Sequence, residues 1–391
     1  MQFESIDQTK VEYGVSVYSQ NIVLHAEDNP MQGVDDPGPH QRYQNPTLQV
    51  EQRELNKLSP EMIRVQMHYA GICGTDVHMT EQDPETGYIR SSAPASIPAQ
   101  GRIIGHEGVG RILEAGENVR FLEPGMFVTF ESIIVCHYCD MCRKGLFNQC
   151  RRAKLLGLEH DGLFGDIVDV PASLAHNISQ MINSEQDLVA MSCVEPAGVA
   201  HVACQNARIS AGDKTLVFGA GPIGLLCCVL AKNVFGASEV HLVEPIEYRR
   251  NLAARWADTT YSHKEQLPAG CQSLDVLIEA SGSLDNVTDM FLRMGPNSRI
   301  VLLARSGKPL SITKVDHMIS NAITIVGSRG HLCGAFTDIF NLYKNQRLPL
   351  EEIVSMKTHG ISGLYDIMCR PEDILHKNCK VLAKISSMEE S

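Results

Sequence analysis

The sequence predicts an α/β protein with two domains, a mostly-β domain followed by a doubly wound parallel sheet. Three observations lead to this prediction. The chain has 391 residues, which is too long for one hydrophobic core of ordinary size. Its first 190 residues consist of short β-rich runs interrupted by Pro and Gly. After about residue 195, short apolar strands alternate with helical patterns, which is the order expected of βαβ units.

In the first domain, residues 1–190, the expected strands are short and separated by turns. Such strands are typical of an antiparallel, barrel-like domain. Before them, residues 27–46 form an acidic, turn-rich stretch. The expected strands span residues 62–68, 102–104, 127–130 and 166–170.

In the second domain, residues 191–330, strands and helices alternate. This order implies a parallel sheet with helices on both faces. Beyond residue 327 the pattern becomes mixed and ends in a strand-like run at 380–385, so we expect residues 331–391 to return to the first domain. The expected strands are 214–218, 239–243, 275–279, 299–303 and 323–326, with helical patterns at 225–235 and 247–256.

Composition and charge restrict the partners of the protein. A hydrophobic fraction of 43% and a charged fraction of 20% are typical of a soluble globular protein. The net charge of −12 argues against binding to nucleic acid or to an anionic membrane. Residues 1–14 lack the apolar core of a secretory leader, and thirteen cysteines then favour a reducing compartment, which predicts a cytoplasmic protein.

A glycine-rich turn, Gly-Ala-Gly-Pro-Ile-Gly at 219–224, joins the first strand of the second domain to the helical pattern after it. This strand–turn–helix context is the one that a dinucleotide-binding fingerprint requires. In such a turn Gly219 permits the sharp bend, Gly221 lets the backbone approach a pyrophosphate, and Gly224 allows close packing of helix on strand. The helix N-terminus then offers free N–H groups to the phosphates.

Glu244 follows Gly224 by twenty residues, at the end of the next expected strand. A carboxylate there accepts the ribose hydroxyls of NAD and repels the 2′-phosphate of NADP, so NAD is the expected cofactor. Arg249 and Arg250 follow closely and leave NADP open as an alternative. The residues expected to bind the cofactor are Gly219, Gly221, Pro222, Ile223, Gly224, Glu244 and Arg249.

Four cysteines, Cys136, Cys139, Cys142 and Cys150, lie in one short segment. Their spacing allows four thiolates to bind one tetrahedral Zn²⁺, which leaves no open position for a substrate. We therefore expect a structural zinc lobe at residues 131–155. The alternative is four free or disulfide-paired cysteines.

A second metal site is suggested by Cys73, in Gly-Ile-Cys-Gly-Thr-Asp-Val-His at 71–78, and by His106, in Gly-His-Glu-Gly at 105–108. Either residue alone is more often structural. Next to a nicotinamide site and a zinc lobe, however, they indicate a catalytic zinc, which takes three protein ligands and keeps one position open.

In combination these motifs resemble those of zinc-dependent medium-chain dehydrogenases, most closely the sorbitol (polyol) and L-threonine dehydrogenase branch. The resemblance extends over roughly residues 60 to 330. It implies a GroES-like catalytic domain interrupted in sequence by a Rossmann domain, with the active site in the cleft between them. The motifs are residues 73–78, 105–107, the four cysteines, Val-Glu-Pro at 194–196, and residues 219–224 and 244–249.

The resemblance assigns the zinc ligands. Cys73 and His106 would bind the catalytic zinc. In this branch Glu107 is the usual third ligand, and Glu195 lies close, binding directly or through the zinc water. In the ethanol-type branch a cysteine takes the place of Glu195, and Cys193 is only two residues away, but the Glu-Pro pair favours Glu195.

The resemblance also assigns a proton relay. Thr75 and His78 match the positions at which a hydroxyl passes a proton through the nicotinamide ribose to an imidazole near the surface. The ordinary histidine pKa of about 6.5 suits the last step. A structural role is the alternative for both residues.

The predicted protein is a dehydrogenase dependent on zinc and NAD. It would oxidise a secondary alcohol of a polyol, sugar, cyclitol or amino alcohol to a ketone, because zinc lowers the pKa of a coordinated hydroxyl and the nicotinamide accepts hydride. The resemblance implies two zinc ions per subunit, one structural and one catalytic, and a homodimer or homotetramer. The alternatives are an L-threonine-type dehydrogenase and a non-catalytic NAD- and zinc-binding sensor or scaffold.

Three segments depart from the family pattern or leave the substrate undefined. Residues 1–60 and 81–100 are longer than in the family, and they would border the substrate entrance or form surface or oligomer contacts. Residues 327–331 fall where the family closes the cleft. Arg329 in this loop would bind a substrate carboxylate or phosphate, or contact the cofactor.

Overall fold

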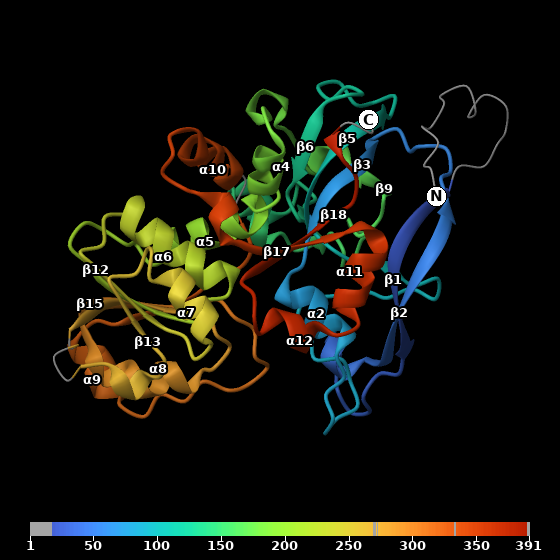
Figure 1. The fold of residues 1–391 in the computed structure, drawn as a ribbon. Coiled ribbons are helices and arrows are strands. Elements are labelled where there is room, and N and C mark those ends of the chain that lie inside the picture. The colour runs from blue at the N-terminus through green and yellow to red at the C-terminus, as the bar shows by residue number, and fades with distance from the viewer. Residues whose placement is uncertain (1–17, 269–270, 272, 332–333, 389–391) are drawn as a thin grey trace.

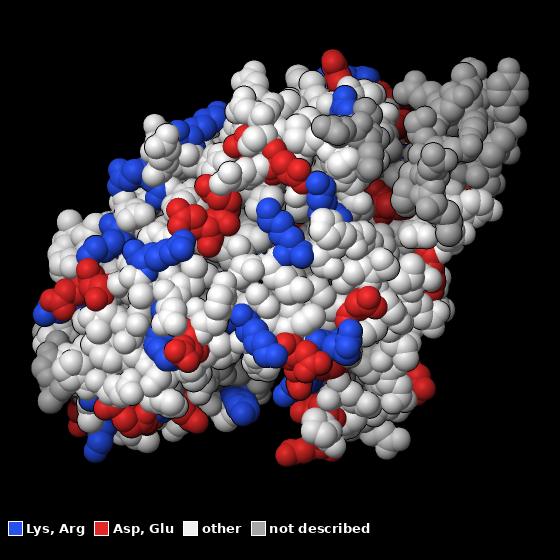
Figure 2. All heavy atoms as spheres, in the orientation of Figure 1, with Lys and Arg blue, Asp and Glu red and all other residues white. Residues whose placement is uncertain are grey.

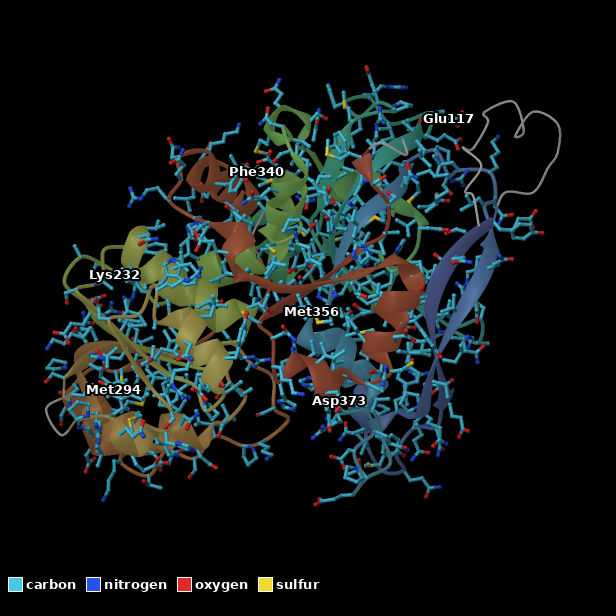
Figure 3. The ribbon with its side chains drawn as sticks, viewed as in Figure 1. Glu117, Lys232, Met294, Phe340, Met356 and Asp373 are labelled. Atoms are coloured by element: carbon cyan, nitrogen blue, oxygen red, sulfur yellow. The ribbon has the colours of Figure 1, made fainter. Side chains whose placement is uncertain are left out.

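The computed structural model describes residues 18–268, 271, 273–331 and 334–388 (Figure 1). The prediction for residues 1–14 lies outside this range. Two lobes lie side by side, and the predicted α/β class is confirmed. In Figure 3, Lys232 and Met294 lie in one lobe, Glu117 and Asp373 lie in the other, and Met356 lies near the junction.

One lobe is built on a six-stranded parallel sheet with the order β13-β12-β11-β14-β15-β16. The first three strands of this lobe, β11 to β13, follow one another toward one edge of the sheet, and the next three, β14 to β16, follow one another toward the other edge. The direction in which strands are added therefore reverses between β11 and β14. This reversal is where open α/β sheets bind ligands, at the carboxyl ends of the strands. The strands are β11 (Lys214–Phe218), β12 (Glu239–Val243), β13 (Thr259–Tyr261), β14 (Leu274–Glu279), β15 (Met294–Leu302) and β16 (Thr324–Gly327).

The sequence predicts five of these six strands. It misses β13, which has three residues, none of them buried. It also starts β15 at 299, whereas the strand begins at Met294, because Met-Gly-Pro-Asn reads as a turn. The helices of this lobe are α6 (Pro222–Asn233), α7 (Glu247–Ala253), α8 (Asp285–Met290) and α9 (Val315–Ser320).

The other lobe contains a seven-stranded sheet with the order β10-β6-β5-β3-β18-β17, in which β9 also pairs with β3. β18 pairs antiparallel with β3, so the last strand of the chain lies in the sheet formed by the first domain. The strands are β3 (Met62–Gly71), β5 (Glu107–Ala115), β6 (Phe127–Phe130), β9 (Ile167–Pro171), β10 (Ala175–Asn177), β17 (Val354–His359) and β18 (Lys380–Lys384).

A long hairpin, β1 (Tyr18–Asp28) and β2 (Tyr43–Glu54), lies at the outer side of this lobe and pairs with the short β4 (Arg102–Ile103) (Figure 1). The sequence identifies a turn-rich stretch at 27–46 but not the two strands beside it. The reason is the composition of β2, whose side chains are mostly polar and largely exposed. Only Ile22, Val23 and Leu24 of β1 are fully buried.

The predicted cysteine lobe contains the two-stranded sheet of β7 (Ile133–Ile134) and β8 (Lys154–Leu155), with the short helix α3 (Asp140–Arg143) between them. The two large lobes share a hydrophobic core, because α5 packs against both α6 and β5, and Tyr69 of β3 and Val109 of β5 belong to the same core cluster as the buried residues of α6. The remaining helices are α2 (Gly74–Thr80), α4 (Glu185–Met191), α5 (Val194–Asn206), α10 (Ala335–Lys344), α11 (Gly360–Met368) and α12 (Pro371–Leu375).

On the face shown in Figure 2, acidic and basic side chains are interspersed. Within the described residues no single helix is long and apolar enough to cross a membrane. The pair α4 and α5, bent by 44°, meets that criterion only when the two helices are taken together.

Candidate active site

Three metal-ligating side chains meet where β3 and β5 come together. The ligand atoms of Cys73, His106 and Glu107 lie within 4.8 Å of one another. The strand register explains this arrangement, because Gly71 at the end of β3 pairs with Glu107 at the start of β5. Cys73 then follows β3 as the N-cap of α2, and His106 directly precedes β5.

Asp76, which sequence reasoning did not assign, connects two of these residues. Its Oδ2 accepts a hydrogen bond from the Cys73 backbone N–H at 3.0 Å, and its Oδ1 lies 3.3 Å from Nδ1 of His106. Burial lowers the pKa of His106, but the charges of Asp76 and Cys73 outweigh this and raise it well above its ordinary value. The cluster therefore favours a positive charge at this place, and Asp76 leaves Nε2 of His106 available to a metal.

Glu107 forms a buried ion pair with Lys380 of β18. Lys380 is fully buried, and its Nζ also donates to the carbonyl of Ile72 at 2.9 Å. The segment that ends the chain thus supplies the counter-charge for a candidate metal ligand. Sequence reasoning missed Lys380 because a lysine at a strand end is normally solvated.

Glu195 belongs to a neighbouring network. It lies in the first turn of α5, and its Oε1 accepts a hydrogen bond from Ser132 Oγ at 2.7 Å. The Ser132 backbone N–H donates to Nε2 of His331 at 3.1 Å. Burial raises the pKa of Glu195 to about 7 and lowers that of His331 to about 4, so His331 is neutral at neutral pH.

The geometry separates the alternatives for the third ligand. Glu107 groups with Cys73 and His106, whereas Glu195 lies outside that group. Cys193 is fully buried and points its thiol toward the carbonyl of Val189 at 3.7 Å. One cysteine, one histidine and one carboxylate make up a ligand set that catalytic zinc sites use, with a fourth position left for water or substrate.

The two predicted relay residues lie on α2, the helix that begins after Cys73. Thr75 is half-buried, and His78 lies one turn further along the helix at the surface. Desolvation lowers the pKa of His78, and the charge of Glu81 partly opposes this shift. His78 is therefore neutral at neutral pH and able to accept a proton.

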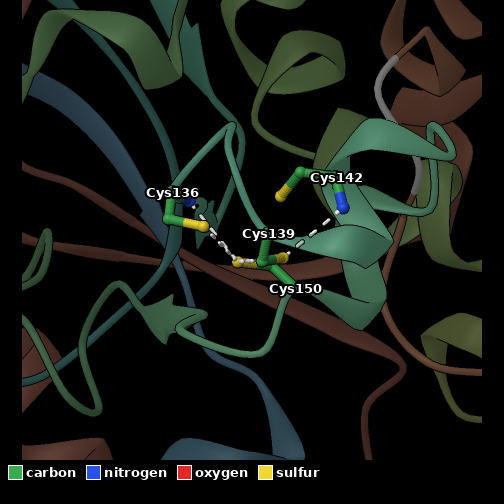
Figure 4. Close-up of side chains that lie close together, drawn as sticks. All are labelled: Cys136, Cys139, Cys142 and Cys150. Atoms are coloured by element: carbon green, nitrogen blue, oxygen red, sulfur yellow. Dashed lines mark hydrogen bonds between the residues drawn. The ribbon is translucent and has the colours of Figure 1, made fainter.

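The four cysteines of the lobe converge on one point (Figure 4). Cys150 Sγ lies 3.6 Å from Cys136 Sγ and 3.9 Å from Cys139 Sγ. Four sulfurs placed about 2.3 Å from a tetrahedral zinc are about 3.8 Å apart, whereas a disulfide requires about 2.05 Å. The spacing fits zinc and excludes disulfide pairing of these cysteines.

The glycine turn has the shape that a dinucleotide requires. Gly219 has φ +91°, a backbone conformation that side chains disfavour, and a Cβ at Gly224 would lie 2.0 Å from the carbonyl oxygen of Gly219. A Cβ at Gly221, in contrast, would meet no protein atom within 4 Å, so this side is open to a ligand. Pro222 and Ile223 begin α6, whose N-terminus faces the same opening.

Glu244 lies beside the glycine turn. It is buried, and its Oε2 accepts a hydrogen bond from the Ala220 backbone N–H at 2.7 Å. The structure places Arg249 differently, because its guanidinium donates to the carbonyls of Leu375 and Asn378 in the segment before β18. Arg250 stays beside Glu244, since its guanidinium donates to the carbonyls of Glu244 at 2.8 Å and Pro245 at 3.1 Å.

Comparison with known proteins agrees with this geometry. Residues 59–180 match the alcohol dehydrogenase GroES-like domain. An L-threonine 3-dehydrogenase from Pyrococcus furiosus is 31% identical over 317 residues, which cover 78% of this chain and 87% of the relative. The chain belongs to the zinc-dependent medium-chain dehydrogenase family. It lies in the polyol and threonine branch, as its motifs predict.

Two further comparisons extend this result. A scyllo-inosose 3-dehydrogenase from Thermotoga maritima is 33% identical over 297 residues, covering 70% of this chain and 73% of the relative. The solved structure of a candidate alcohol dehydrogenase from Thermotoga maritima superposes with a TM-score of 0.84 at 26% identity, covering 94% of this chain and all of that one. This medium-chain dehydrogenase is an oxidoreductase that uses zinc and a nicotinamide cofactor and acts on the CH–OH group of an alcohol.

Proposed function

We propose that this dehydrogenase oxidises a secondary alcohol of a polyol, sugar or cyclitol to a ketone, with NAD⁺ as the hydride acceptor. The observation that carries this proposal is the buried cluster of Cys73, His106 and Glu107 in a chain that also forms a dinucleotide turn. The relationship to a scyllo-inosose 3-dehydrogenase supports a polyol-like or cyclitol-like substrate.

Each residue of the site has a role in this reaction. Cys73, His106 and Glu107 would hold the zinc, and Asp76 orients the imidazole of His106. Bound zinc supplies a Lewis acid that makes the coordinated hydroxyl more acidic, and NAD⁺ takes up the hydride. Thr75 and His78 carry the released proton to the surface. His78 can accept it because its imidazole is neutral at neutral pH, and because its pKa is lowered it then releases the proton readily to water.

The preference for NAD⁺ rests on Glu244. Its buried carboxylate would face the 2′-phosphate of NADP⁺ and repel it. Arg249 is engaged by two backbone carbonyls of the segment before β18, and Arg250, which donates to the carbonyls of Glu244 and Pro245, is the cation that remains near the carboxylate.

Two zinc ions per chain are proposed, one at the catalytic cluster and one in the cysteine lobe, since the structure contains these two ligand groups among its described residues. A homo-oligomer is proposed as well. β16 is an edge strand of its sheet, and the exposed apolar side chains of Leu292, Val315 and Ile319 lie in the segments that precede β15 and β16. Cysteines that all remain free within the described residues support a cytoplasmic location.

An L-threonine-type dehydrogenase is the second candidate, favoured by the relative from Pyrococcus furiosus. The two candidates share the same zinc and hydride chemistry and differ in what binds the rest of the substrate. The L-threonine reaction requires recognition of an amine and a carboxylate beside the reacting hydroxyl.

The test is NADH formation across polyols, cyclitols, sugars and L-threonine, with NADP⁺ in parallel and zinc counted in the same sample. Turnover of a polyol or cyclitol with NAD⁺ supports the proposal, and turnover confined to L-threonine supports the second candidate. Cys73→Ser should abolish turnover, while the matched variant of an exposed cysteine, Cys369→Ser, should not. The absence of turnover on every compound would refute both candidates.

A further inference from the structure

Two arginines lie close together at the carboxyl edge of the parallel sheet. Arg305 follows the end of β15, and Arg329 follows the end of β16. The Ser328 backbone N–H donates to the carbonyl of Leu302 at 2.9 Å, which holds the two strand ends beside each other. Arg305 is exposed and Arg329 half-buried, and partial desolvation together with the charge of Arg329 lowers the pKa of Arg305, as expected for two cations in proximity.

Neither guanidinium has a carboxylate partner within ion-pair distance in the described part of the chain. Other arginines of this acidic protein do have one, including Arg64 with Asp169, Arg102 with Asp161 and Arg299 with Asp213. Two neighbouring cations without a counter-charge cost free energy through mutual repulsion. An anion between them would remove that cost.

The strand order places these two arginines on the side of the sheet that is remote from the expected binding site of the cofactor phosphates. The glycine turn follows β11 and Glu244 follows β12, while β15 and β16 lie on the opposite side of β11. At about 4.8 Å per strand, the ends of β15 and β16 are roughly 10 and 14 Å from the end of β11. A dinucleotide whose adenosine lies at Glu244 therefore extends its nicotinamide half toward the two arginines.

Both arginines also adjoin the catalytic lobe. Arg305 donates to the carbonyl of Ser92 at 3.1 Å, within the segment 81–100 that is longer than in the family. The carbonyl of Arg329 accepts a hydrogen bond from Asn148 at 2.8 Å, and two residues further His331 contacts Ser132. The same loop thus leads from the arginines to the network around Glu195.

We propose that Arg305 and Arg329 bind an anionic group, a carboxylate or a phosphate, carried by the alcohol substrate. This inference rests on the proposed function and narrows its substrate class to acidic or phosphorylated polyols. Guanidinium groups suit this role because their planar donors bind both anions in a bidentate manner.

The experiment compares neutral and anionic members of matched substrate pairs: sorbitol with sorbitol 6-phosphate, and sorbitol with gluconate. The anionic member of one pair should have a kcat/KM roughly tenfold or more above that of sorbitol, and the pair that shows this identifies the anion. In Arg305→Gln and Arg329→Gln, the KM of that anionic substrate should rise roughly ten- to hundredfold, while the KM of NAD⁺ and the turnover of sorbitol stay unchanged. Arg293→Gln is the matched control, because Arg293 also donates to one backbone carbonyl, that of Pro268 at 3.1 Å.

Several results would overturn the inference. Equal turnover of neutral and anionic members would refute it and leave the proposed function intact. A rise in the KM of NAD⁺ in the arginine variants would show that they bind the cofactor instead. If no compound is turned over, calorimetric titration of the zinc-loaded protein with inorganic phosphate, in the presence of NADH, still tests the anion site. Phosphate binding that is lost in the double variant Arg305→Gln/Arg329→Gln supports the site. Absence of phosphate binding to the wild type excludes it.

Discussion

Replacing Lys380 with methionine tests the buried charge pair at the metal site. Lys380 is fully buried, and Glu107 is 2% exposed. Methionine fills a similar volume but leaves the carboxylate without a counter-charge and the carbonyl of Ile72 without its donor. Breaking a buried ion pair from one side costs about 3–5 kcal/mol. We therefore expect the free energy of unfolding of the catalytic domain to be about 3–5 kcal/mol lower in zinc-free Lys380→Met than in the zinc-free wild type. Urea-induced unfolding measures this difference.

Binding of zinc should restore much of the unfolding free energy that Lys380→Met loses. Without Lys380 the cluster of Cys73, His106 and Glu107 is more negative, so the variant should bind the catalytic zinc more tightly in competition with a chelator. The double variant Lys380→Met/Glu107→Gln should regain most of the stability of the zinc-free protein, because no uncompensated charge remains. A purely structural role for Lys380 predicts weaker zinc binding instead.

Lys232→Met is the matched control. Lys232 forms an ion pair with Asp258 at 2.7 Å, with about a third of each side chain exposed. Such surface pairs contribute about 0–1 kcal/mol. The reasoning on Lys380 is refuted if Lys380→Met costs no more than this control, or if its catalytic zinc dissociates more readily than in the wild type.

Four further predictions concern other parts of the protein. Asp76→Asn should weaken the catalytic zinc about 10–100-fold in chelator competition, because His106 loses its orienting carboxylate, and unchanged affinity would contradict this. Cys139→Ser should reduce the zinc content by one ion per chain while the catalytic zinc stays bound, as metal analysis can show. Glu244→Ser should lower kcat/KM for NAD⁺ and raise it for NADP⁺; an equal loss for both would count against the assignment. Burial lowers the pKa of His68 below 6.5, so the unfolded chain binds the extra proton first and stability falls as pH drops below about 6.5. His68→Gln should flatten this acid-side slope in unfolding experiments, and an unchanged slope would exclude His68 as its source.

The site residues that the sequence identifies most directly are those that lie close to one another along the chain. The four cysteines and the glycine turn each lie within a short segment, so spacing predicts that their residues act together, whereas Glu107 beside His106 is assigned by the family resemblance. Five of the six parallel strands follow from their apolar runs for the same reason. In contrast, the β1–β2 hairpin has a polar strand on its outer side, and its alternation carries little hydrophobic signal.

The partners of the metal site are harder to predict because they come from distant segments. Lys380 lies 273 residues from Glu107 in sequence, and His331 lies 199 residues from Ser132. Nothing in the local sequence of Lys380 marks it as part of a site, and His331 is indicated only by the resemblance, as the last residue of the loop 327–331. Asp76 is different, since an acid three residues after a helix N-cap is a recognisable capping signal that also predicts its bond to Cys73.

The register of three strands explains how these distant residues meet. Gly71, at the end of the central strand β3, pairs with Glu107 of β5 on one side and with Leu382 of β18 on the other. A Cβ at this glycine would lie 2.9 Å from Cε of Lys380 and 3.1 Å from Oε2 of Glu107. A side chain at position 71 would therefore push the lysine away from the carboxylate. The ion pair beside the metal cluster requires glycine at that point, and it also requires the last strand of the chain to pair with the first strand of the catalytic sheet.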